Sequence, residues 1–196
     1  MALMESTAVT TNPNKVAVFI DNSNVFRSLN DLKTTDPLWV CFYNPLILAQ
    51  KLAGTRELVH VAFYCVRPPA YLLEEGEKGI KKHSTTLQYY SAIEKLSPLL
   101  QVKYGDLRGT KGNLQEKNVD TQLATDMVTM AALGKFDTAI LISNDGDYVS
   151  AVKNVKESFL KKVEVLFLMN RLSMALRSVC DITRRARRSH FEKLSF

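Results

Sequence analysis

The sequence predicts an α/β protein with a doubly wound, mainly parallel sheet of five to six strands flanked by helices. Two observations predict this class. Continuous apolar runs rich in Val, Ile, Phe and Tyr recur along the chain without the alternation of a half-exposed strand, which suits strands covered on both faces. Longer segments with apolar residues at helical spacing separate these runs, and strands that alternate with helices favour a parallel sheet.

The expected strands are residues 15–20, 58–66, 99–104, 138–142 and 162–168. The expected helices are residues 44–52, 79–96, 121–133, 147–159 and 172–180. Several helix ends carry start or stop residues: Pro45 follows the possible cap Asn44, Pro98 stops the second helix, and Gly134 is a plausible C-cap of the third.

The remaining segments are expected to be irregular. Residues 1–14 are interpreted as a disordered leader, and 15–183 as a single domain. Residues 30–42 are expected to form a loop after the first helical turn, and 105–118, with three glycines, a mobile loop. Residues 184–196 are interpreted as a basic C-terminal tail or helix end.

Composition indicates a soluble protein that favours polyanions. The 196 residues carry a formal net charge of +6, which suits nucleic acid without proving that it is bound. The leader lacks the pattern of a signal peptide, no apolar run is long enough to cross a membrane, and the three cysteines show no zinc or redox spacing. A cytoplasmic location is therefore expected. A homodimer is possible, although no surface for it can be located from the sequence.

Four aspartates stand where strands end or helices begin. Asp21 follows the first strand, Asp120 opens a helix, and two more follow the fourth strand, Asp145 and Asp147. The carboxyl ends of parallel strands meet at one edge of a sheet, where ligands bind. Carboxylates crowded there repel one another unless a cation joins them, so a Mg²⁺ or Mn²⁺ site is predicted.

Each aspartate also has a purely structural interpretation. Asp21 and Asp120 could cap helices, and the Asn-Asp-Gly turn around Asp145 could need its carboxylate only for backbone geometry. Asp126 is a secondary acidic candidate, because six positions after Asp120 it lies well around the helix from its partner.

Three segments resemble the signature blocks of the NYN domain. They are FIDNSN at 19–24, EKNVD at 116–120 and LISNDGDY at 141–148. The NYN domain is part of the PIN-like, Rossmann-like nuclease superfamily, and the chain is similar to its LabA-like branch over most of its length. The family usually has Gly where Asn22 and Asn144 stand, and a Gly before the fifth strand, where Lys161 and Lys162 suggest a remodelled turn.

The resemblance implies a metal-dependent ribonuclease. By motif, the four aspartates Asp21, Asp120, Asp145 and Asp147 would be catalytic metal ligands, with Asn24 a polar partner of the first and Ser143 a hydroxyl beside the last pair. RNA would be held by basic residues of the 105–118 loop and the C-terminal run, namely Arg108, Lys111, Lys117, Arg184 and Arg185. The run at 184–188 could equally be a solvated helix end.

Three other functions compete with this one. The main alternative is a catalytically inactive NYN-type module that binds RNA or protein. A metal-dependent adhesion module of the von Willebrand A type would share Asp21-Asn-Ser23 and Asp145-Gly146, but Val25 offers no oxygen at the fifth position of that motif. An aspartyl-phosphate phosphatase would need a second Asp where Ser23 stands.

Overall fold

The structure is a computed structural model that describes residues 13–109, 112–113, 115–169, 171 and 173–196. Its strands are β1 Lys15–Asp21, β2 Glu57–Val66, β3 Leu100–Arg108, β4 Gln115–Lys117, β5 Thr138–Ile142, β6 Lys162–Phe167 and β7 Ile182–Arg185. Within the described residues they form one sheet in the order β4-β3-β2-β1-β5-β6-β7. Only β4 is antiparallel to its neighbour, so the predicted doubly wound, mainly parallel sheet is confirmed.

Helices connect the strands. The α-helices are α1 Asn22–Thr35, α2 Pro45–Ala53, α3 Gly76–Glu94, α4 Val119–Ala132, α5 Val149–Lys153 and α6 Met174–Val179. Shorter turns are η1 Ala70–Glu74, η2 Gly146–Tyr148, the π-helical η3 Asn154–Ser158 and η4 Arg188–His190. The Asn44 side chain accepts hydrogen bonds from the backbone N–H groups of Leu46 and Ile47, which confirms the predicted cap of α2.

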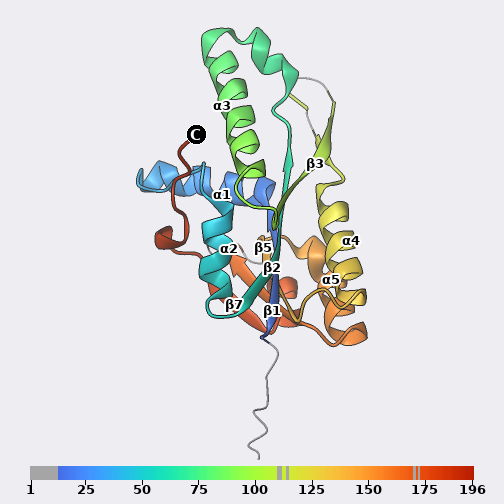
Figure 1. Cartoon of the computed structure of the whole chain (residues 1–196). Helices are drawn as coiled ribbons and strands as arrows, with labels where there is room; N and C mark the ends of the chain where they lie inside the picture. The colour runs from blue at the N-terminus through green and yellow to red at the C-terminus, as the bar shows by residue number, and fades with distance from the viewer. Residues whose placement is uncertain (1–12, 110–111, 114, 170, 172) are drawn as a thin grey trace, which may run out of the picture.

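The sheet is covered on both faces, and the residues of β1 divide between the two cores. Val16, Val18 and Ile20 pack with α1, α2 and α3, whereas Ala17 and Phe19 pack with α4 and α5. Figure 1 shows these two groups of helices on opposite sides of the sheet. Because both faces are buried, neither can show a polar stripe, which explains the continuous apolar runs of the sequence.

Four sequence predictions of local structure were wrong. Residues 30–35 continue α1, and β3 with β4 form an antiparallel pair inside the segment expected to be a loop at 105–118. The single helix expected at 147–159 is divided into η2, α5 and η3. Arg184 and Arg185 lie in β7, so the basic run does not end a helix. The leader expected at 1–14 lies outside the described residues except for Pro13 and Asn14.

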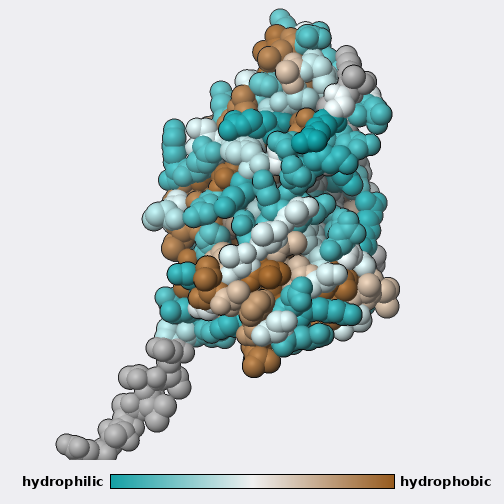
Figure 2. All heavy atoms as spheres, turned by 90° about the vertical axis from the view of Figure 1, so that its right-hand side faces the viewer, coloured by the Kyte–Doolittle hydropathy of each residue, from teal (hydrophilic) through white to brown (hydrophobic). Residues whose placement is uncertain are grey.

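Figure 2 shows the side of the molecule that carries α4 and α5. Its surface is mostly hydrophilic, with hydrophobic side chains gathered toward the lower end. The two most exposed apolar residues that follow these helices are Leu133, at 64%, and Leu160, at 86%. A homodimer stays a prediction.

None of the described helices is long and apolar enough to cross a membrane.

Candidate acidic site at the carboxyl edge of the sheet

The sheet changes its direction of growth between β1 and β5. From β1 the chain builds outward through β2 and β3, whereas β5, β6 and β7 continue on the other side. Ile20 pairs with Ile142 at the carboxyl ends of the two central strands. Ligands of open α/β sheets bind outside this switch point. The strands that precede Asp21 and Ser143 are therefore neighbours at the switch point.

Asp21 is the buried centre of this edge, with 2% of its surface exposed. Its Oδ1 accepts a hydrogen bond from the backbone N–H of Asn24 at 3.1 Å, so Asp21 does cap α1. Its Oδ2 accepts from the hydroxyls of Ser143 at 3.0 Å and Tyr148 at 3.2 Å. Capping therefore occupies one carboxylate oxygen and leaves the other facing the hydroxyls of Ser143, directly after β5, and Tyr148 in η2.

The Tyr148 hydroxyl joins Asp21 to a second carboxylate. It also lies 2.8 Å from Oδ1 of Asp120, in the first turn of α4. Gly105 lets α4 start this close to the sheet, because a Cβ there would stand 2.8 Å from the backbone oxygen of Lys117 and would collide with Val119. A hydroxyl has one proton to donate, so Tyr148 cannot fully satisfy both carboxylates at once.

The surroundings of Asp21 are unfavourable to negative charge. Burial, and to a smaller extent the charge of Asp120, raises the pKa of Asp21 from 3.8 to about 6 despite three hydrogen bonds that lower it. Burial and the two carboxylates raise the pKa of Tyr148 far above its usual value, so the hydroxyl stays protonated. Among the described residues no Lys, Arg or His forms an ion pair with either carboxylate.

Asp145 and Asp147 occupy the same edge but are held differently. The carboxylate of Asp145 accepts the backbone N–H of Asp147 at 3.1 Å, and its own N–H donates to Ser143 Oγ at 3.1 Å. Asp145 is half-buried and Asp147 exposed. In the described part of the chain, no three His, Cys, Asp or Glu side chains are grouped to hold a metal ion. The expected four-carboxylate cluster is thus found only as the Asp21–Asp120 pair.

Polar side chains fix the loops around this pair. Asn24 accepts the backbone N–H of Asn144 at 3.2 Å, so it links α1 to the segment after β5. Asn144 in turn donates to Ser28 and accepts the N–H of Leu168. Neither Asn22 nor Asn144 adopts positive φ, so hydrogen bonding rather than backbone freedom accounts for asparagine at these positions.

Two groups of predicted site residues have other partners. Asp126 accepts from the Tyr64 hydroxyl at 2.8 Å and pairs with Lys103 at 3.5 Å, so its charge is already compensated. Arg184 pairs with the buried Glu164 at 2.8 Å, next to Arg56 at 2.6 Å.

The other predicted RNA contacts lie on exposed surfaces. Arg108 and Lys117 are exposed on the β3–β4 pair, directly before α4, and Arg185 is exposed on β7. Arg108 makes a 3.8 Å contact with Asp106. Lys111 lies outside the described residues.

Tyr148 is the residue whose importance the sequence analysis missed. Its position directly after Asp147 was visible, but a tyrosine in a motif gives no sign that its ring is fully buried and its hydroxyl returns to Asp21. The buried Ser28 and its bond to Asn144 had no sequence signal either, because Ser28 lies inside a helix.

The donor set fits a hard divalent cation. Asp21 and Asp120 supply carboxylate oxygens within 3.2 Å of one hydroxyl, and their shared negative charge lacks a counter-ion among the described residues. Mg²⁺ commonly binds through one or two carboxylates and keeps several waters, so a two-carboxylate site suffices for it. A cation there would also offset the burial penalty, and the smaller repulsion from Asp120, that raise the pKa of Asp21.

The fold and the acidic edge define a class: a doubly wound α/β domain with a buried carboxylate, Asp21, beside the exposed Asp120 at its switch point. The sequence profile of the NYN domain matches residues 15–185, and the chain belongs to this family. The resemblance to the NYN domain is thereby confirmed, and membership of the PIN-like superfamily is consistent with it, whereas the LabA-like branch stays a prediction.

A solved structure supports the fold alone. The crystal structure of a protein of unknown function from Vibrio parahaemolyticus aligns with a TM-score of 0.62 and 17% identity. The alignment covers 96% of this chain and 99% of the Vibrio chain. No curated protein matches the sequence.

Proposed function

We propose that the protein is a metal-dependent ribonuclease that hydrolyses RNA phosphodiester bonds at the acidic edge. The observation that carries the proposal is the buried Asp21, which shares the Tyr148 hydroxyl with Asp120 at the switch point of an NYN domain. Proteins pair a buried charge with a counter-charge, and Asp21 has none among the described residues. Membership of a nuclease superfamily supports the reaction class.

Asp21 and Asp120 would hold Mg²⁺ or Mn²⁺, and Asp145 and Asp147, which lie at the same edge outside this pair, would contact the waters that the ion retains. When bound, such an ion lowers the pKa of a coordinated water and polarises a phosphate oxygen. The protein's own groups would keep the carboxylates in place: Ser143 and Tyr148 orient Asp21, and Asn24 fixes the loop after β5. Arg108, Lys117 and Arg185 are the proposed phosphate contacts, and Arg184 is left out because it pairs with Glu164.

The test is cleavage of end-labelled single-stranded RNA with Mn²⁺, with Mg²⁺ and with EDTA. Wild type is expected to cut with metal and to stop in EDTA. Asp21→Asn and Asp145→Asn are expected to lose cleavage by at least about 100-fold, in the range of transition-state charge stabilisation. Glu57→Gln is the matched control, because Glu57 is exposed at the opposite end of β2 and should cut normally. Full activity in both aspartate variants would refute the proposal.

The alternative is an NYN module that binds RNA or protein without cutting. Wild type that binds RNA and leaves it intact in every metal would establish it. A cytoplasmic location is also proposed, supported by Cys41, Cys65 and Cys180, all of them described and none in a disulfide.

A further inference from the structure

A pocket of about 400 Å³ lies beside the acidic site, on the face of the sheet covered by α1 and α3. It opens between the first turns of α1, the segment that follows β2, and α3. Asn22 and Ser23, which directly follow Asp21, form one of its walls. A volume of this size is at the lower end of small-molecule sites, so it suits one nucleotide rather than a folded partner.

The lining of the pocket combines aromatic rings with positive charge. Its rings come from Phe26, Phe42, Tyr71, Tyr89 and Tyr90. Arg27, Arg67 and Lys82 supply cations, and the described lining residues include no Asp or Glu. Aromatic faces stack unpaired bases, and cations track phosphates, which is the usual composition of a single-strand binding site.

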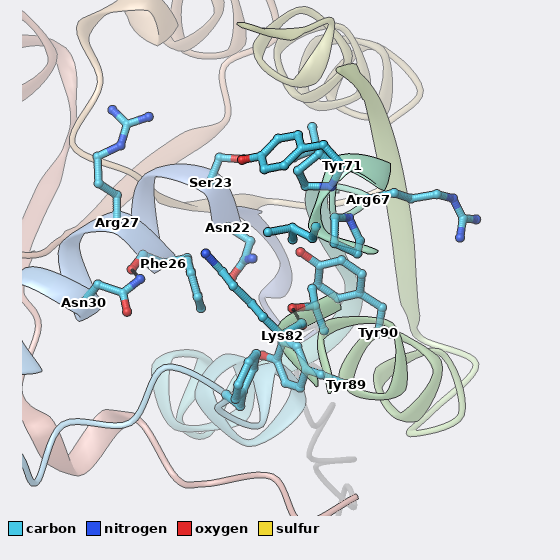
Figure 3. A pocket seen from close by; sticks show the side chains of 16 residues that line it. Asn22, Ser23, Phe26, Arg27, Asn30, Arg67, Tyr71, Lys82, Tyr89 and Tyr90 are labelled. Carbon is cyan, nitrogen blue, oxygen red and sulfur yellow. Dashed lines mark hydrogen bonds between the residues drawn. The ribbon is translucent and has the colours of Figure 1, made fainter. Parts of the chain in front are cut away.

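Lys82 is the cation that reaches into the pocket. Figure 3 shows its side chain running across the cavity toward Asn22 and Phe26, whereas Arg67 points away from it. Arg67 is held over the Tyr104 ring at 4.0 Å from its centroid. Lys82 is exposed and forms no ion pair with any residue in the described part of the chain, so its ammonium is available to a ligand.

Asn22 presents hydrogen-bond donors to the same space. It is 3% exposed, and its carboxamide oxygen accepts the hydroxyl of the fully buried Tyr43 at 3.2 Å. That bond fixes the amide so that its NH₂ group is left for the pocket, and no described residue accepts from this group. Asn22 and Lys82 therefore offer donors and no acceptor.

We infer that this pocket binds an unpaired base of the RNA strand beside the scissile phosphate, and that it prefers a keto base, uracil or guanine, to adenine. Uracil and guanine present carbonyl acceptors to paired donors. Adenine places its amino group beside the ring acceptors N1 and N7, and Asn recognises the N6/N7 edge only when the amide oxygen is available. The inference rests on the proposed function for its location next to cleavage, but base binding can be measured separately.

The experiment is binding of fluorescently labelled ten-nucleotide U and A oligomers, measured by anisotropy in EDTA so that nothing is cut. Wild type is expected to bind the U oligomer about tenfold more tightly, the discrimination of one good base contact. Phe26→Leu keeps apolar bulk but loses the ring, and should weaken U binding about tenfold. Lys82→Ala should weaken U binding by about threefold and reduce the preference for U over A.

Lys81→Ala is the matched control, because Lys81 is exposed on the same helix and outside the pocket. It should bind both oligomers within about twofold of wild type, the residual effect of one exposed charge. Because an A oligomer stacks on itself, the change of the U-to-A ratio in Lys82→Ala, not the ratio itself, reports the base contact.

The outcomes separate this inference from the proposed function. Unchanged U binding in both pocket variants would overturn the pocket while cleavage by wild type could still stand. Equal affinity for U and A in wild type would overturn the keto preference. Binding that depends on Phe26 and Lys82 in a protein that never cuts RNA would support the pocket and refute the nuclease.

Discussion

Replacing Asp21 by Asn should stabilise the metal-free protein while removing its activity. The pKa of Asp21 rises from 3.8 to about 6 on folding. The ionised carboxylate therefore opposes folding at neutral pH by about 3 kcal/mol, at 1.36 kcal/mol per pKa unit. Asn keeps the shape and can donate to Ser143 and Tyr148, so a gain of about 1–3 kcal/mol in the free energy of unfolding is expected at pH 7.5.

The sign of the pH dependence is set by the raised pKa. The folded state holds the Asp21 proton more tightly than the unfolded chain, so the contribution of this group is most favourable below pH 3.8. It is lost as the pH rises from 3.8 to about 6 and is constant above that value. The advantage of Asp21→Asn over wild type should therefore be small near pH 4 and grow to its full size by pH 7.

Urea unfolding followed by circular dichroism in EDTA, at several pH values between 4.5 and 7.5, measures this difference. Mn²⁺ should then raise the unfolding midpoint of wild type and not that of Asp21→Asn, because the ion binds the folded carboxylates. Glu57→Gln controls for the loss of one negative charge. An Asp21→Asn protein that is less stable than wild type by the same amount at every pH would refute the argument.

Other substitutions test individual contacts. Tyr148→Phe leaves two carboxylates without their shared donor and should cost about 1–2 kcal/mol of stability, and cleavage should fall about tenfold. Arg56→Met leaves Glu164, 4% exposed, with one cation fewer and should lower stability by about 3 kcal/mol in thermal unfolding. Leu160→Gly should stabilise by about 1 kcal/mol and Gly134→Ala destabilise by as much, because both positions have positive φ; an opposite sign in either would contradict this.

The sheet could be predicted because burial leaves a local trace in the sequence. Each central strand, covered on both faces, is an apolar run that can be recognised without knowing its neighbours. The two strands that were missed lack that trace. β4 has three residues, and all of them are polar. β7 is half-exposed and contains two arginines, one of which forms an ion pair with the buried Glu164 of β6. Their pairing depends on partners that are distant in the chain.

The site was predictable in its position but not in its internal arrangement. Asp21 and Asp120 could be placed at one edge from the order of strands and helices. The arrangement of the two carboxylates depends on Tyr148, whose hydroxyl contacts both of them. Asp21 lies 127 positions before Tyr148 in the sequence and Asp120 lies 28 positions before it, so this contact has no local signal. The turn before β6 has its left-handed residue at Leu160, directly before Lys161. The conformation of this turn depends on all of its residues, so it could not be predicted from the residue at one position.

Cut sites should follow base identity, because the last residue of β1 and the first residue of α1 place consecutive side chains in two adjacent sites. Asp21 carries the acidic pair and Asn22 faces the pocket, and neighbouring Cα atoms are only about 3.8 Å apart. If Asn22 holds a base, no more than about one nucleotide of the RNA strand fits between that base and the phosphate at Asp21. On a mixed-sequence RNA, the 5′ ends of the fragments should map beside uracil or guanine, and Lys82→Ala should weaken that bias. Cuts distributed without regard to base would show that the two sites act independently.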